Sequence, residues 1–160
     1  MLLYLSYLWD EGEPKKAFDK AIHNSNKVAL SLSDLFCVQR HKEHFLELVK
    51  NKIDIVFANE QEFLSLINSN SFDEAVSFSK ILKKNIIITR GEKGAIAISN
   101  DEVFECPAKQ NLKIKDLTGA GDLFAAGYLH GFVNNFSTEK SLEEGTKLSS
   151  NIIEKIGARL

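Results

Sequence analysis

Short apolar runs alternate with amphipathic stretches through the first ninety residues, and this alternation restricts the chain to very few fold classes. The apolar runs have the length of β-strands, which are expected at residues 1–8, 27–31, 53–58 and 85–89. Apolar residues at helical spacing indicate helices at 14–24, 40–50, 60–67 and 72–83, whereas 33–39 is expected to be irregular. Because strands and helices that alternate form βαβ units, the sequence predicts an α/β fold with a mostly parallel sheet.

After residue 90 the pattern changes to a hairpin followed by two helices. Two short strands at 94–99 and 102–106 are joined at Asn100–Asp101, a pair that favours a hairpin turn. The helices are expected at 121–134 and 138–155. We expect a single domain over residues 1–160, with ligands at the carboxyl ends of the parallel strands. The first strand has no partner before it in the sequence, which predicts that the chain begins partway through a larger fold.

The charge balance and the apolar pattern exclude several classes of protein. The 160 residues include 20 Lys and Arg against 22 Asp and Glu, and this near balance argues against a surface for nucleic acid or anionic membranes. No apolar run approaches the roughly 20 residues that span a bilayer. Cys37 and Cys106 have neither metal-ligand spacing nor the density of a disulfide framework. We therefore expect a cytoplasmic protein that binds neither nucleic acid nor membranes.

The strongest functional signal is a glycine-rich turn that leads into the long apolar helix. Residues 116–122 read Asp-Leu-Thr-Gly-Ala-Gly-Asp. The small residues let backbone approach a ligand closely, and the free N–H groups of a helix start attract phosphate. An isolated Gly-x-Gly-Asp is more often a structural turn with a favourable first-turn acid, but the flanking Asp116 and Thr118 favour the functional interpretation. Phe124 replaces the third glycine of a dinucleotide fingerprint, and no Walker loop occurs, so both of those motifs are excluded.

Two further motifs have both a structural and a functional interpretation. Asn59 and Glu62 have the spacing of a helix N-cap and its capping-box partner. Thr89, Gly91 and Gly94 lie where a strand ends and a hairpin begins, a turn that needs glycine for its geometry. From the local sequence alone, a purely structural role and a ligand-binding role stay open for both motifs.

In their order and separation, these three motifs resemble those of the carboxyl-terminal half of PfkB-type (ribokinase-like) carbohydrate kinases, a family that includes adenosine kinases. Residues 31–38 and 156–159 further resemble adenosine-kinase-like members. The resemblance implies a three-layer ribokinase-like α/β fold that is truncated at its amino-terminal side. Complete members are longer, and their amino-terminal half carries the acceptor-binding residues and the lid strands.

The resemblance also implies roles for individual residues in phosphoryl transfer from ATP. Asp122 would be the catalytic base, and Glu62 would help to hold Mg2+ through water. The residues that match the anion hole, as backbone N–H donors, are Gly119, Ala120 and Gly121. The residues that match the nucleotide site are Asn59, Thr89, Gly91 and Gly94. Asp116 and Thr118 match positions that bind a monovalent cation, such as K+, in some members.

We therefore expect an ATP-dependent kinase that phosphorylates a hydroxyl group of a sugar or nucleoside. The alternative is a non-catalytic nucleotide-binding remnant, or a half-enzyme that needs a separate amino-terminal half. A sheet that is cut at one edge exposes apolar surface and backbone groups, which favours association. The expected partners are the small-molecule substrate and either a second copy of the chain, in a homodimer, or the missing half.

Overall fold

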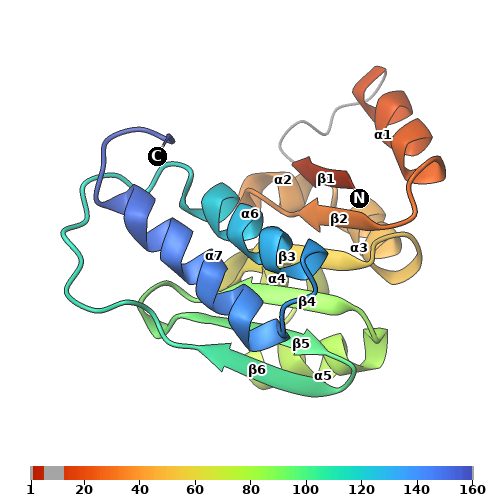
Figure 1. Ribbon diagram of the computed structural model, residues 1–160. Helices are drawn as coiled ribbons and strands as arrows, with labels where there is room; N and C mark the ends of the chain where they lie inside the picture. Colours follow the sequence, from red (N-terminus) through yellow and green to blue (C-terminus); the bar gives the residue numbers. More distant parts are fainter. Residues whose placement is uncertain (1, 6–12, 160) are drawn as a thin grey trace. The chain divides into compact units, whose positions relative to one another are not determined.

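The structure, a computed structural model, describes residues 2–5 and 13–159, and it alternates strands with helices along the chain (Figure 1). Residue 1 and residues 6–8 of the first predicted strand lie outside the described residues. The strands are β1 (Leu2–Leu5), β2 (Val28–Ser31), β3 (Ile55–Asn59), β4 (Asn85–Thr89), β5 (Ala95–Ser99) and β6 (Glu102–Cys106). The helices are α1 (Glu13–His23), α2 (Leu35–Arg40), α3 (Lys42–Asn51), α4 (Glu60–Ile67), α5 (Phe72–Leu82), α6 (Ala120–Val133) and α7 (Thr138–Ile153), with a 3-10 turn, η2, at Gly91–Lys93.

The described strands follow one another in the sheet in the order β1-β2-β3-β4-β5-β6. β1 pairs in parallel with β2, with Leu2 opposite Val28, and β2 pairs in parallel with β3, with Ala29 opposite Ile55. Parallel neighbours need a crossover connection, and a helix lies between the strands of each of these pairs in the sequence. The prediction of an α/β fold with a mostly parallel sheet is confirmed.

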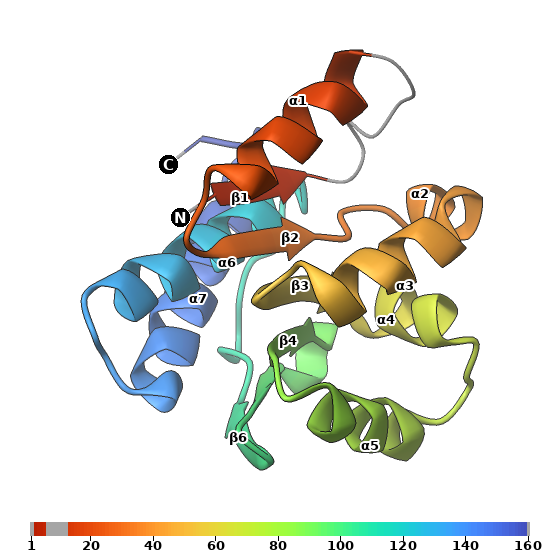
Figure 2. The same ribbon diagram turned by 90° about the vertical axis from the view of Figure 1, so that its right-hand side faces the viewer.

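The chain divides into two compact units, each of which is described by itself. The first unit comprises residues 1–88 and 98–102, and the second comprises 89–97 and 103–160. Figure 2 shows α3, α4 and α5 together on one side of β2, β3 and β4 in the first unit. The continuous apolar runs of these strands are continuously buried, as expected of parallel strands. Large or central residues of this core include Ala29, Leu30, Phe45, Ile55, Phe63 and Ile87.

The stretch that we expected to be irregular, residues 33–39, instead contains α2. Asp34 is the N-cap of this helix, and its Oδ1 accepts hydrogen bonds from the N–H groups of Phe36 at 2.7 Å and Cys37 at 3.1 Å. Cys37 and Val38 are the buried residues of this helix. A helix of 6 residues is too short to show a clear apolar period, so the sequence prediction missed it.

The second unit is built around an antiparallel pair of helices, α6 and α7, which lie side by side (Figure 1). Their backbones approach closely because small residues line the contact. A Cβ atom on Gly127 would lie 2.5 Å from the carbonyl oxygen of Glu144, and one on Gly145 would lie 2.8 Å from that of Phe124. Among the described residues, no helix has the length and apolar character needed to cross a membrane.

Candidate functional site

The start of α6 presents backbone N–H groups that the described residues do not use. Gly119 is the N-cap, with φ +79 and ψ 0, and the N–H of Ala120 donates to the carbonyl oxygen of Leu117 at 3.2 Å. The N–H groups of Gly119, Gly121 and Asp122 have no acceptor among the residues that the structure describes. Free N–H groups and the positive end of the helix dipole together attract an anion. Of the three predicted anion-hole residues, Ala120 is therefore the one whose N–H already has a partner.

The loop before α6 is held by Asp116 and by the segment that follows α7. One Asp116 carboxylate oxygen, Oδ1, accepts from the N–H of Thr118 at 2.9 Å and from its hydroxyl at 2.7 Å, and Oδ2 accepts from the N–H of Gly157 at 2.9 Å. These hydrogen bonds, with the Thr118 hydroxyl contributing most, lower the pKa of Asp116. A Cβ atom on Gly119 would lie 2.9 Å from that of Ala158, so only glycine fits this turn at its positive φ. The Asp116 carboxylate thus fixes the loop, and the cation predicted beside it stays a prediction.

Asp122 projects from the first turn of α6 as an exposed side chain. Its carboxylate has no hydrogen bond or ion pair with any residue in the described ranges. An ionised carboxylate is a hydrogen-bond acceptor only, so this group can accept a bond from an incoming hydroxyl. Asp122 follows Gly121 directly in the first turn of α6, and its role as a base stays a prediction.

The predicted nucleotide loop at residues 89–94 is a tight turn around η2. The N–H of Arg90 donates to the carbonyl oxygen of Gly94 at 2.7 Å, which closes the turn. Gly94 has φ +91, and a Cβ atom there would lie 2.1 Å from the carbonyl oxygen of Cys106. A Cβ atom on Gly91, by contrast, would have no neighbouring atom within 4 Å, so open space lies beside this glycine. One glycine of the loop is required by the fold, and the other borders a space that a ligand can enter.

A cavity of about 630 Å³ in the second unit joins this loop to the start of α6. Cavities of 300 to 1,000 Å³ are of the size that holds small-molecule ligands, on the order of a nucleotide. Five of the predicted site residues line it together: Thr89, Gly91, Gly94, Ala120 and Gly121. The remaining wall is largely apolar, with Leu112, Ile114, Phe124 and Ile153 among its residues. The predicted residues outside this lining are Asn59, Glu62, Asp116, Thr118, Gly119 and Asp122.

Asn59 and Glu62 form a capping box in the first unit, so the structural interpretation of this motif is confirmed. The N–H of Glu62 donates to Asn59 Oδ1 at 2.8 Å, and the N–H of Asn59 donates to Glu62 Oε2 at 2.9 Å. The Asn59 amide also donates to Glu62 Oε1 at 2.7 Å. Burial raises the pKa of Glu62, the hydrogen bond from the Asn59 N–H opposes this, and the charge of Asp34 adds to it. Both carboxylate oxygens are thus engaged, although each retains a lone pair.

The described residues contain no cluster of three or more His, Cys, Asp or Glu side chains that could hold a metal ion. Mg2+ is usually held by one or two carboxylates together with substrate phosphates and water. A single carboxylate such as Glu62 is compatible with that mode of binding and not with a preformed cage.

The loop at residues 108–114 and the helix α7 also form parts of the cavity wall, and none of their residues was among the predicted site residues. Four residues of α7 line the cavity with this loop, namely Thr146, Ser149, Ser150 and Ile153. The loop has neither helical nor strand periodicity, and the small polar residues of α7 resemble an ordinary solvated helix face. No local pattern in the sequence distinguishes them as ligand contacts.

Comparison with known proteins assigns the chain to a family. Residues 9–160 match the pfkB family of carbohydrate kinases, and the chain belongs to this family. It is similar to the crystal structure of adenosine kinase from Sinorhizobium meliloti, with 34% identity and a TM-score of 0.94 over 99% of this chain and 50% of that one. It is also similar to a probable sugar kinase from Rhizobium etli CFN 42, with 35% identity and a TM-score of 0.93 over 99% of this chain and 50% of that chain.

A curated relative, the nucleoside kinase of Methanocaldococcus jannaschii, is 30% identical over 121 residues, which are 76% of this chain and 39% of the relative. The chain therefore spans half or less of the length of these relatives. The family and the ribokinase-like α/β fold that the three motifs predicted are confirmed.

Proposed function

We propose that this chain provides the ATP-binding and catalytic part of a kinase that phosphorylates a hydroxyl group of a sugar or nucleoside. The observation that carries the proposal is the cavity of about 630 Å³, which the loop at residues 89–94 and the start of α6 line together. A glycine-rich loop and a helix start on one cavity are the means by which proteins bind polyphosphates through backbone N–H groups. In this proposal residues 1–160 act as one carboxyl-terminal kinase portion.

The start of α6 would stabilise the phosphoryl group as it moves. Phosphoryl transfer passes through a loose transition state, so positioning and charge stabilisation provide most of the catalysis. The free N–H groups of Gly119, Gly121 and Asp122 can bind the oxygens of the terminal phosphate. Ala120 would contribute only by sharing the N–H that it donates to Leu117. The anion hole that we propose therefore includes the N–H of Asp122 in addition to those first predicted.

Asp122 would act as the base for the acceptor hydroxyl. As the acceptor oxygen forms its bond to the terminal phosphorus, the bond between that phosphorus and the ADP oxygen breaks, and the Asp122 carboxylate takes the hydroxyl proton. An exposed carboxylate without a partner in the described part of the chain is free to orient that hydroxyl.

We also propose positions for the ions. Mg2+ would neutralise phosphate charge when it arrives with ATP, and Glu62 would hold it through water, with Asn59 near the phosphates. The remaining lone pairs on the Glu62 oxygens support this assignment. Asp116 and Thr118 keep their proposed role in binding a monovalent cation such as K+.

A second candidate function is non-catalytic nucleotide binding by a half-enzyme. It is favoured by the finding that the chain spans half or less of the length of its relatives. Catalysis requires both reactants to be held in line, and loss of one side can remove about 7–11 kcal/mol of positional advantage. Association with a separate amino-terminal half, or with a second copy of the chain, belongs to this candidate.

Replacement of the proposed base tests the two candidates. The chain is assayed alone and joined to the amino-terminal half of a relative, such as the Sinorhizobium meliloti adenosine kinase, with ATP and with adenosine or common sugars. In whichever of these two forms is active, Asp122→Asn should lower turnover by about 10²- to 10⁴-fold and leave the affinity for ATP nearly unchanged.

Asp73→Asn is the matched control, because Asp73 is also an exposed first-turn acid, in α5. This variant should retain full activity. Normal turnover by Asp122→Asn would remove Asp122 from the proposed role. Nucleotide binding without turnover in either form would support the second candidate instead.

A further inference from the structure

The cavity loop, residues 107–117, runs from β6 toward α6 and provides much of the cavity wall. It has no regular secondary structure, so its backbone N–H groups need acceptors from other elements. The N–H groups of Lys115 and Asp116 donate to the carbonyl oxygen of Ile153, at 2.8 and 3.3 Å. Ile153 is the last residue of α7, so the backbone of the cavity loop is attached to the carboxyl end of that helix.

A third N–H group of the cavity loop, that of Lys113, donates to a side chain at the same end of α7. Its acceptor is Oε1 of Glu154, at 3.0 Å. No other N–H group of the cavity loop has an acceptor among the residues that the structure describes. Leu112 and Ile114, the neighbours of Lys113 in the sequence, both line the cavity. The Glu154 carboxylate therefore holds a part of the cavity wall without itself lining the cavity.

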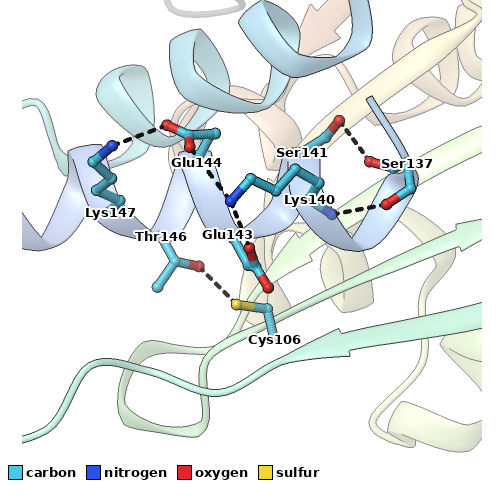
Figure 3. Close-up of polar contacts among 8 residues, drawn as sticks. All are labelled: Cys106, Ser137, Lys140, Ser141, Glu143, Glu144, Thr146 and Lys147. Carbon is cyan, nitrogen blue, oxygen red and sulfur yellow. Dashed lines mark hydrogen bonds and ion pairs between the residues drawn. The ribbon is translucent and has the colours of Figure 1, made fainter. Parts of the chain in front are cut away.

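The stability of α7 alone does not explain the position of Glu154. This residue is the C-cap of the helix, where the helix dipole opposes a negative charge. Glu144, within the helix, instead pairs with Lys140 and Lys147 of the same helix, as Figure 3 shows. In the described part of the chain, the only hydrogen bond of the Glu154 carboxylate is the one to the cavity loop.

We infer that Glu154 is a positioning residue, which holds the cavity loop in the conformation that binds the nucleotide. The inference rests on the proposed function for the identity of the ligand. A loop that loses one of its attachments visits other conformations, and the apparent affinity falls with the fraction of molecules in the binding conformation. The charge of Glu154 has the opposite effect, because a carboxylate near the cavity repels an anionic ligand. Positioning and charge therefore predict opposite results when this side chain is shortened.

The test compares Glu154→Ala and Glu154→Gln with the unmodified 160-residue chain, using ADP in isothermal titration calorimetry. Glu154→Ala removes the acceptor, so ADP binding should weaken about three- to tenfold, the effect of one hydrogen bond. Glu154→Gln removes the charge but keeps a side-chain oxygen that can accept, so the affinity for ADP should be retained. The melting temperature of Glu154→Ala should change little, because loss of an exposed hydrogen bond is offset by loss of a charge that opposes the helix dipole.

Ser141→Ala is the matched control for a purely structural role. Ser141 is a buried residue of α7 outside the cavity lining, and its hydroxyl donates to the carbonyl oxygen of Ser137 at 2.9 Å (Figure 3). This variant should lower the melting temperature and leave the affinity for ADP unchanged. The expected result is thus the reverse of that for Glu154→Ala.

Amide hydrogen exchange, followed by NMR, tests the contact directly and without nucleotide. The N–H of Lys113 should exchange faster in Glu154→Ala than in the unmodified chain or in Glu154→Gln. Equal exchange in the three chains would overturn the inference. Unchanged or tighter ADP binding by Glu154→Ala, or equal weakening by Glu154→Gln, would also overturn it while the proposed function stands. Failure of the unmodified chain to bind ADP would overturn both.

Discussion

Gly94 is the position at which a single methyl group should do most damage to the candidate site. Its φ of +91 and ψ of -139 lie in a region that only glycine adopts readily. A Cβ atom there would lie 2.1 Å from the carbonyl oxygen of Cys106 and 2.8 Å from the backbone nitrogen of Ala108. Both neighbours are backbone atoms, so no side chain can rotate away. We predict that Gly94→Ala destabilises the protein and displaces the loop at residues 89–94.

The magnitude follows from two contributions. Holding a residue with a side chain in this backbone region costs about 1–3 kcal/mol. Real Cβ contacts are essentially never under 3.0 Å, so the 2.1 Å contact requires a backbone shift of 0.9 Å (3.0 minus 2.1). Overpacking of this kind costs about 1–3 kcal/mol more. Together they predict a loss of about 4 kcal/mol in the free energy of unfolding. Gly91→Ala should lose only about 1 kcal/mol, because Gly91 has a positive φ but no atom within 4 Å of the added methyl.

Urea unfolding, followed by far-UV circular dichroism, measures the free energy of unfolding of both variants. ADP titration measures how each substitution changes the affinity of the cavity for ADP. The reasoning predicts a large loss of stability for Gly94→Ala, and weaker ADP binding for both variants, since both glycines line the cavity. If Gly94→Ala is within about 1 kcal/mol of Gly91→Ala, the close backbone contact does not constrain the loop, and the argument is refuted.

Two further predictions concern pH. Burial raises the pKa of Tyr128 to about 12 from 10.0, so the free energy of unfolding should fall by about 3 kcal/mol as pH rises through this interval. Urea titrations should show that Tyr128→Phe loses this pH dependence. An unchanged pH dependence in the variant would contradict the raised pKa of Tyr128. Burial also raises the pKa of Glu62 from 4.5, so its stabilising contribution is present below that pH and is lost as pH rises through the folded-state pKa. The stability of the unmodified chain relative to Glu62→Gln should therefore decrease as pH rises above about 4.5, and a constant difference would contradict the burial of this carboxyl group.

Local patterns predicted most of the secondary structure because the relevant signals lie within a few residues. The strand expected at 85–89 is β4, whose isoleucines are bounded by polar residues. The turn at Asn100 and Asp101 was predicted as a hairpin, and both residues have positive φ, at +51 and +68. Ser71, followed three residues later by Glu74, has the spacing of a capping box. Ser71 does accept from the N–H of Glu74, at 3.4 Å, but the Glu74 carboxylate binds the Ser69 hydroxyl instead.

Local sequence patterns could not predict contacts between residues that are far apart along the chain. Asp116 and Gly157 are 41 residues apart, and Cys106 and Thr146 are 40 apart, yet the structure brings each pair into contact. Neither pair has a local pattern that signals the contact. The motif at 116–122 indicated the position of the free N–H groups, but it did not indicate that Ala120 already donates its own N–H to Leu117, three residues earlier.

The glycines of the two loop motifs divide into pairs with different physical requirements. Gly94 and Gly119 have positive φ and lie against other parts of the protein, so the fold requires them. A Cβ atom on Gly91 or Gly121 would have no atom within 4 Å, and both residues line the cavity. Packing within the protein does not exclude a side chain at this second pair. The absence of side chains there keeps the backbone open to the cavity, which is the arrangement that a phosphate bound through N–H groups requires.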